Sequence, residues 1–110
     1  AALEAAGELA KEGREIEVVD LRCLWPWDRE TVLASVRKTG RLLIAHEAVR
    51  VGGFGAEIAA VVAEEAHGAL KAPVRRVGSP RAPIAYAPPL EDLLRVTPAT
   101  IARAARGLFA

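Results

Sequence analysis

The sequence predicts an α/β fold, a three-layer α/β/α arrangement around a mainly parallel sheet. Helical patterns alternate along the chain with short β-branched or aliphatic runs, and glycine, proline or a capping residue bounds most of them. The core must be aliphatic, because 52% of the 110 residues are hydrophobic and only 5% are aromatic. Such a composition is typical of parallel strands that helices cover on both faces. Right-handed crossovers between successive strands make the sheet parallel. At this length we expect residues 1–110 to form one domain.

The first predicted elements are helix, strand and helix. Residues 1–12 have a helical apolar pattern that ends at Gly13, a residue favoured just beyond helix ends. The β-branched run Glu15–Asp20 predicts the first strand. Asp28 is a good N-cap for a helix that continues to about Lys38.

Two further strands and the longest helix are predicted from aliphatic runs, the helix lying between the strands: Arg41–His46, Gly53–Leu70 and Pro73–Gly78. Ser79–Pro89 carries four prolines, so we expect an irregular, extended segment there. A short helical turn is expected over Leu90–Leu94. Thr97 followed by Pro98 is the pattern of a cap and a first helical residue, and it opens the last helix.

Composition excludes several functional classes. The net charge is +1, from 15 basic and 14 acidic residues, which argues against a nucleic-acid partner. The single cysteine, Cys23, excludes an internal disulfide and a cysteine-based metal cluster. No apolar run approaches the ~20 residues of a membrane span, so no membrane partner is expected. The chain begins at Ala1 without Met or a capping residue, and we expect it to be a fragment of a longer polypeptide.

Three glycines follow the second predicted strand, at the mouth of the longest helix. Gly53 and Gly55 have the spacing of a dinucleotide-binding fingerprint, but Ile58 stands where the third glycine belongs. Gly52, Gly53 and Gly55 are better explained as residues that let the backbone turn and let another surface approach closely. We therefore predict that this loop, with Phe54, lies at a subunit contact beyond the carboxyl edge of the sheet.

His46 and Glu47 end the second predicted strand, where acid–base residues often lie. Adjacent residues of a strand point to opposite faces, so the two side chains cannot easily act as a pair. We predict that they order an interface. Cys23 is interpreted as a small buried hydrophobe rather than a nucleophile, and Asp20 lacks the acidic cluster of a phosphoacceptor site.

Two aromatic residues and a basic cluster complete the candidates. Trp25 and Trp27 either pack as a lid on the edge of the core or serve as exposed contact anchors. Arg75, Arg76 and Arg81 form a cluster too small for a nucleic-acid surface, and a solvated face is the simpler interpretation.

Several motifs together resemble the β subunits of 2-oxo acid dehydrogenases, in the order and spacing of that family. The segments that carry the resemblance cover nearly the whole chain: Glu17–Leu24 with Pro26 and Asp28, Ser35–Arg41, His46–Ala48, Gly52–Ile58, Ala72–Val77, Pro83–Ala87 and Leu90–Glu91. The chain is identified as similar to the C-terminal domain of such a subunit, a domain shared with transketolase. The His46–Ala48 and Gly52–Phe54 variants resemble branched-chain enzymes more than pyruvate enzymes.

The resemblance implies a role in a large enzyme. Family members decarboxylate a 2-oxo acid with thiamine diphosphate and Mg²⁺ and acylate a lipoyl group on an acyltransferase core. They are heterotetramers of two α and two β subunits, whose catalytic and cofactor-binding residues lie outside this domain. The resemblance thus implies a cytoplasmic protein, or one of the mitochondrial matrix if eukaryotic, with neither cofactor nor catalytic residue in this chain.

The resemblance also implies a docking surface for the acyltransferase near the end of the domain. Lys71 replaces an acidic residue that helps binding in some relatives, so we expect Lys71 to lie near this surface without serving as the anchor. The acyltransferase would then be bound through Glu91 and Asp92 or through apolar contacts. Two alternatives remain open at this point. One is the same domain in another thiamine enzyme, such as a transketolase or a deoxyxylulose-phosphate synthase. The other is a free-standing α/β ligand-binding regulatory module.

Overall fold

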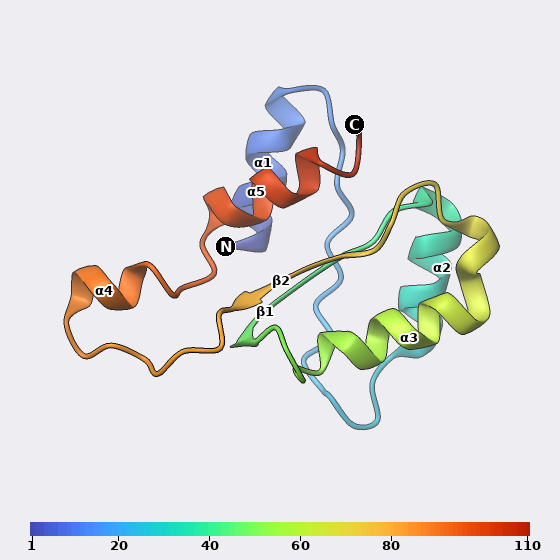
Figure 1. The fold of residues 1–110 in the computed structure, drawn as a ribbon. Helices are drawn as coiled ribbons and strands as arrows, with labels where there is room; N and C mark the ends of the chain where they lie inside the picture. The colour runs from blue at the N-terminus through green and yellow to red at the C-terminus, as the bar shows by residue number, and fades with distance from the viewer.

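A small parallel sheet lies between two pairs of helices in the computed structural model, which describes residues 1–110 (Figure 1). The two strands are β1 (Leu43–Val49) and β2 (Arg75–Ser79), and they pair in parallel. The helices, in chain order, are α1 (Ala2–Lys11), α2 (Arg29–Thr39), α3 (Gly55–Ala66), the 3₁₀ turn η1 (His67–Ala69), α4 (Pro88–Asp92) and α5 (Pro98–Arg106). The predicted α/β class with a parallel sheet is confirmed.

Alternation along β1 divides the core into two clusters. Leu43 packs against the cluster between α1 and α5, and its neighbour Ile44 belongs to the cluster between α2 and α3. The first cluster is built on Leu9 and Ile101, and the second includes Val62, which is fully buried. Successive strand residues point to opposite faces, so one strand supplies both layers.

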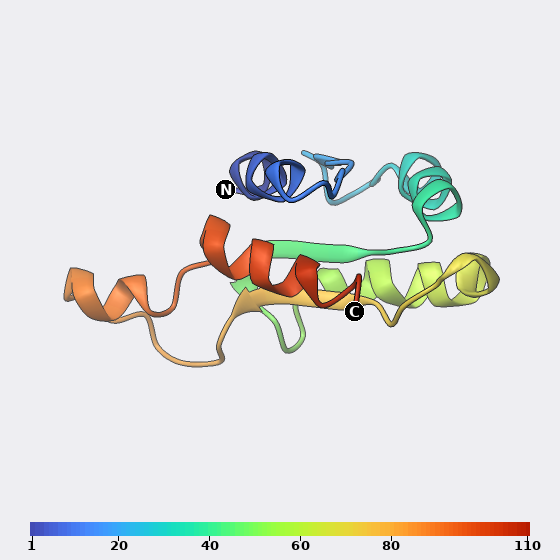
Figure 2. The same cartoon turned by 90° about the horizontal axis from the view of Figure 1, so that it is seen from above.

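The prediction of a first strand over Glu15–Asp20 is wrong: this segment is extended but pairs with no neighbour. It lies beyond the free edge of β1 and runs at a steep angle to it (Figures 1 and 2). Its side chains still alternate between the clusters, Ile16 toward one and Val19 toward the other. The apolar pattern that predicted a strand therefore reflects packing on both sides, without the backbone alignment that a ladder needs.

The predicted caps of α2 and α5 agree with the structure, whereas the helical turn expected over Leu90–Leu94 begins earlier, as α4, because proline is tolerated in the first turn of a helix. The Asp28 carboxylate accepts from the backbone N–H of Thr31 at 3.0 Å, and Gly40 ends α2 in the left-handed region, with φ 71°. The side chain of Thr97 caps α5, with Thr100 bonding back in a capping box. The longest helix, α3, begins and ends inside its predicted bounds. At its C-terminal end the reason is η1, which continues the chain as a 3₁₀ turn from His67.

One ion pair ties the chain ends together. Arg106 of α5 donates three hydrogen bonds to the carboxylate of Glu12, just after α1, and the shortest N–O distance is 2.5 Å. This hydrogen bonding holds the pKa of Glu12 below its ordinary value. Since α1 and α5 come from opposite ends of the sequence, the pair joins elements that the chain itself does not connect.

The segment between β2 and α5 extends away from the body of the molecule, with α4 at its far end (Figure 1). We call residues 80–96 the arm. It exposes apolar side chains: Ile84 by 79%, Tyr86 by 101% and Leu93 by 77% of their surface. No helix of the chain is long and apolar enough to cross a membrane.

Candidate functional site

The imidazole of His46 fills a space that three glycines leave open at the carboxyl end of the sheet. A β-carbon on Gly55 would lie 2.9 Å from Nε2 of His46, and one on Gly78 would lie 2.9 Å from its Cε1. On Gly53, a β-carbon would lie 2.8 Å from Cε1 and would overlap the carbonyl oxygen of Val49. Only glycine fits at these places, so the loop glycines accommodate a side chain of their own chain.

The backbone of β1 explains how His46 comes to lie there. The register of the two strands shifts between Ala45 and Val49, so β1 carries a bulge at this point. Within the bulge, Nδ1 of His46 lies 3.0 Å from the carbonyl oxygen of Ala48. A carbonyl only accepts, so Nδ1 is the donor, and in the neutral ring Nε2 carries a lone pair. Nε2 is buried and has no hydrogen-bond partner.

The other predicted interface residues of this loop take different positions. The Glu47 side chain is exposed and forms no hydrogen bond with His46, and its backbone oxygen accepts from Ser79 at 2.7 Å. Phe54 is partly buried and meets Trp27 edge to face, with ring centroids 6.3 Å apart. Gly52 alone has open space around it, with φ 74°. The acid–base pair that the sequence made conceivable is not formed.

The remaining single candidates are separate from one another. The interpretation of Cys23 as a buried residue is wrong: Cys23 is exposed, and the one hydrogen bond of its thiol goes to the carbonyl oxygen of Trp25 at 3.2 Å, not to a histidine. Asp20 pairs with nearby Arg22 at 3.4 Å. Of the two tryptophans, Trp27 is buried in the α2/α3 cluster, as the first interpretation of this loop expects, and Trp25 is 84% exposed, so its role as a contact anchor stays a prediction.

The structure does not bring Lys71 together with Glu91 and Asp92. Lys71 precedes β2, at the amino end of the strands, where its side chain covers Gly40 and its N–H donates to the Gly40 carbonyl at 2.7 Å. Glu91 and Asp92 belong to α4, far out on the arm (Figure 1). Arg41, next to Gly40, donates to the Leu108 carbonyl at 2.8 Å, so only the end of the tail lies near Lys71.

Sequence reasoning missed Gly78 as part of this site. A glycine inside a strand often marks a close approach of backbone, and that was the available signal. Its β-carbon would also lie 2.9 Å from the carbonyl oxygen of Ala48, so the bulge of β1 rests directly on it.

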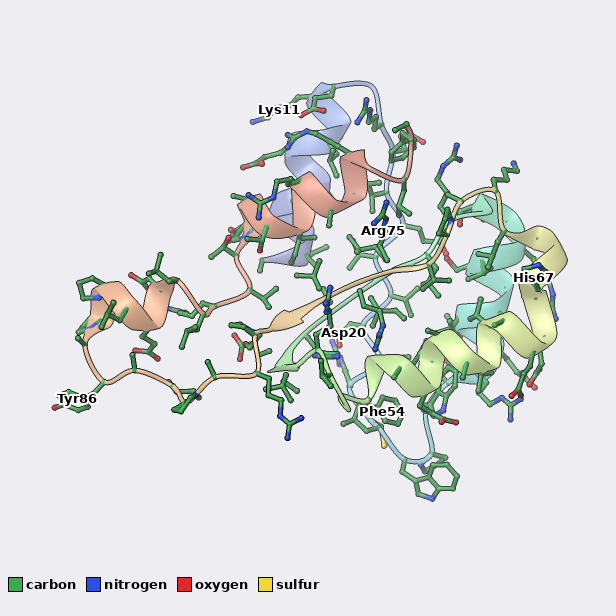
Figure 3. All side chains as sticks on the ribbon, in the orientation of Figure 1. Lys11, Asp20, Phe54, His67, Arg75 and Tyr86 are labelled. Carbon is green, nitrogen blue, oxygen red and sulfur yellow. The ribbon has the colours of Figure 1, made fainter.

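The residues of this site do not fit a diphosphate or a metal ion. His46 occupies the space in front of Gly53 and Gly55, where a phosphate would have to approach the backbone. No group of three or more His, Cys, Asp and Glu side chains is arranged to hold a metal. The loop is packed where β1, β2 and α3 meet, and Phe54 lies at the start of α3 (Figure 3).

The structure defines a parallel α/β domain with a packed loop at its carboxyl edge and an arm that exposes apolar side chains. The comparison with known families identifies the family of this domain. Residues 1–101 match the transketolase C-terminal domain, and the chain belongs to that family.

Two relatives are similar to nearly all of this chain, and a third is similar to two thirds of it. It is 51% identical over 105 residues to the acetoin:2,6-dichlorophenolindophenol oxidoreductase subunit beta of Cupriavidus necator, covering 96% of this chain and 31% of that protein. It is 47% identical over 105 residues to the mitochondrial pyruvate dehydrogenase E1 component subunit beta of Pisum sativum, covering 96% and 29%. With the mitochondrial 2-oxoisovalerate dehydrogenase subunit beta 2 of Arabidopsis thaliana the identity is 55% over 74 residues, covering 67% and 21%. The chain thus spans at most about a third of these relatives.

Proposed function

We propose that this chain is the C-terminal assembly domain of the β subunit of a thiamine-diphosphate-dependent 2-oxo acid dehydrogenase. The observation that carries the proposal is the match across 96% of the chain to β subunits, two of them named for oxidative enzymes of acetoin and pyruvate. The domain's part is to hold subunits together. The chemistry of the whole enzyme belongs to residues outside this chain.

The arm supports an assembly role. Ile84, Tyr86 and Leu93 expose most of their apolar surface to solvent, and exposed apolar patches of this kind mark protein contacts. Aromatic residues such as Tyr86 are also favoured anchors at interfaces. We propose that the arm contacts the α subunit or the second β subunit in a heterotetramer of two α and two β subunits.

The proposal extends to cofactors, substrate and compartment. Thiamine diphosphate and Mg²⁺ would be bound by the rest of the enzyme, since the glycine loop here is filled by His46. A branched-chain 2-oxo acid or pyruvate is the proposed substrate, and the product acyl group would pass to the lipoyl acyltransferase core. The compartment would be the cytoplasm of a bacterium, or the mitochondrial matrix if the source is eukaryotic.

The test is the assembly of the β subunit that contains this chain. Tyr86→Ser together with Leu93→Ser, coexpressed with the α subunit, is expected to shift the tetramer toward smaller species in analytical ultracentrifugation. Leu3→Ser, at a residue that is 75% exposed on α1, is the matched control and should leave the tetramer intact. A tetramer of unchanged stability in the double variant contradicts the assembly role of the arm.

A further inference from the structure

Five arginines line one groove beside the carboxyl end of the sheet. The groove has a volume of about 550 Å³ and lies between β2, the turn after β1, the inner end of the arm and α5. The arginines are Arg50, Arg76, Arg81, Arg95 and Arg103, and no acidic residue lines the groove. These residues come from four segments of the chain, so only the fold brings them together.

The charge of this groove is largely uncompensated. Among the five arginines only Arg95 has a carboxylate partner, Asp92, at a loose 3.5 Å. Arg76 donates to the backbone oxygen of Arg50 at 3.3 Å, a contact that leaves both charges in place. The chain as a whole has a net charge of only +1, so the 95 residues outside the groove carry ten basic and fourteen acidic side chains, a net −4. Positive charge is therefore concentrated here, and an anionic partner is its natural complement.

The groove lacks the features of a site for a small phosphate. The nearest helix start, that of α5, has no free cluster of N–H donors, because Pro98 has none and Thr100 N–H bonds the Thr97 side chain at 3.2 Å. The guanidinium groups are instead spread along an open trough, and four of the five arginines are exposed.

Apolar residues lie between the arginines. Val51 is 58% exposed and Leu93 is 77% exposed, and both line the groove together with Val77 and Leu94. A free anion would leave this apolar surface in contact with water. A polypeptide segment with both carboxylates and aliphatic side chains would pair the arginines and cover the apolar surface at once.

We propose that this groove docks an acidic segment of a partner polypeptide, one in which Asp or Glu residues alternate with aliphatic ones. The groove adjoins the arm, and the two surfaces share Leu93, so the partner would lie continuous with the contacts of the arm. This inference rests on charge and shape alone and stands independently of the enzyme to which the chain belongs.

The test is fluorescence anisotropy of the full chain with a short labelled peptide of alternating Glu and Leu. Arg81→Gln with Arg103→Gln removes two exposed charges that make no ion pair. The double variant should bind roughly two- to thirtyfold more weakly, which is about 0.4–2 kcal/mol for the loss of two exposed ion pairs with the peptide. Arg37→Gln with Arg75→Gln, outside the groove, has the same net charge and should bind like the unaltered chain. Circular dichroism confirms that each variant is folded.

Binding should also weaken as the salt concentration rises, because exposed charges are screened. Three results overturn the proposal: equal binding of the peptide by both double variants, equal binding of a peptide with Gln in place of Glu, or full displacement of the peptide by millimolar inorganic phosphate. Tighter binding of a single-stranded oligonucleotide than of the acidic peptide also overturns it. None of these results bears on subunit assembly through Tyr86, which ultracentrifugation tests separately.

Discussion

Replacing Gly53 with alanine is expected to destabilise the domain itself. The new β-carbon would overlap the carbonyl oxygen of Val49 and would lie 2.8 Å from Cε1 of His46. The carbonyl cannot move without shifting the end of β1, and the imidazole is fixed by its hydrogen bond to the Ala48 carbonyl. Neither group can move away without losing a contact, so the added β-carbon overpacks this site.

The size of the effect follows from two opposing contributions. Overpacking costs about 1–3 kcal/mol, and the lower entropy of the unfolded chain with alanine returns about 0.4–1 kcal/mol. The net loss in the free energy of unfolding is about 1–2 kcal/mol. For a domain of this size that corresponds to a fall in melting temperature of roughly 4–12 °C.

The assay is thermal and urea unfolding followed by circular dichroism, with Gly7→Ala as the matched control. Gly7 lies within α1, and a β-carbon added there would meet nothing within 4 Å, so alanine at this position should stabilise by about 0.5–1 kcal/mol. If glycine-to-alanine substitution lowers the melting temperature at Gly53 and raises it at Gly7, the contact with His46 and the Val49 carbonyl accounts for the difference. A Gly53→Ala variant that melts at or above the unaltered chain refutes the reasoning.

The same experiment separates packing from assembly. If this loop lies at a subunit contact, as the sequence predicted, a β-branched residue at Gly53 should weaken subunit assembly more than it unfolds the domain. A destabilisation that does not depend on protein concentration belongs to the single chain, whereas a concentration-dependent one belongs to an interface. The contacts of Gly53 with His46 lead us to expect the first result.

Three further outcomes are expected. Gly55→Ala should destabilise the domain less in a His46→Ala background than alone, since two of the three closest contacts of the added β-carbon are with the His46 ring. Additive losses of unfolding free energy in a double-mutant cycle would contradict this coupling. Leu9→Ala should cost about 2–5 kcal/mol by urea unfolding, because Leu9 is 1% exposed in the α1/α5 cluster, and a loss below about 1 kcal/mol would place it outside a packed core. The hydrogen bonds from Arg106 lower the pKa of Glu12 in the folded chain. The stabilisation that ionised Glu12 contributes is therefore present above the ordinary carboxyl pKa of 4.5 and is lost as the pH falls through the lowered value. The urea midpoint of Glu12→Gln should fall less across this pH range than that of the unaltered chain.

Local signals in the sequence predicted most of the helices correctly. The cap at Asp28 and the left-handed Gly40 define both ends of α2, and the Thr97 cap opens α5. These predictions succeeded because capping uses residues within four positions of one another, so the information is local. The family was also recognisable from motifs in order along the chain, and residues 1–101 match it.

The strand predictions show where local information ends. The β-branched run Glu15–Asp20 has the same kind of pattern as β1, but it crosses the sheet's edge at an angle and forms no ladder (Figure 2). A strand exists only when a partner backbone runs alongside it, and its own residues do not encode that alignment.

The sequence by itself determined the fold class, both ends of α2, the start of α5 and the family, because each depends on periodicity, capping or motif order. Only the tertiary structure decided what the loop glycines are for: His46 of the same chain lies against Gly53, Gly55 and Gly78. Only it could also gather five arginines from four segments into one groove. The physical reason is the same in both cases. Close approach and net charge of a surface are properties of residues that the fold places side by side, whatever their distance along the chain.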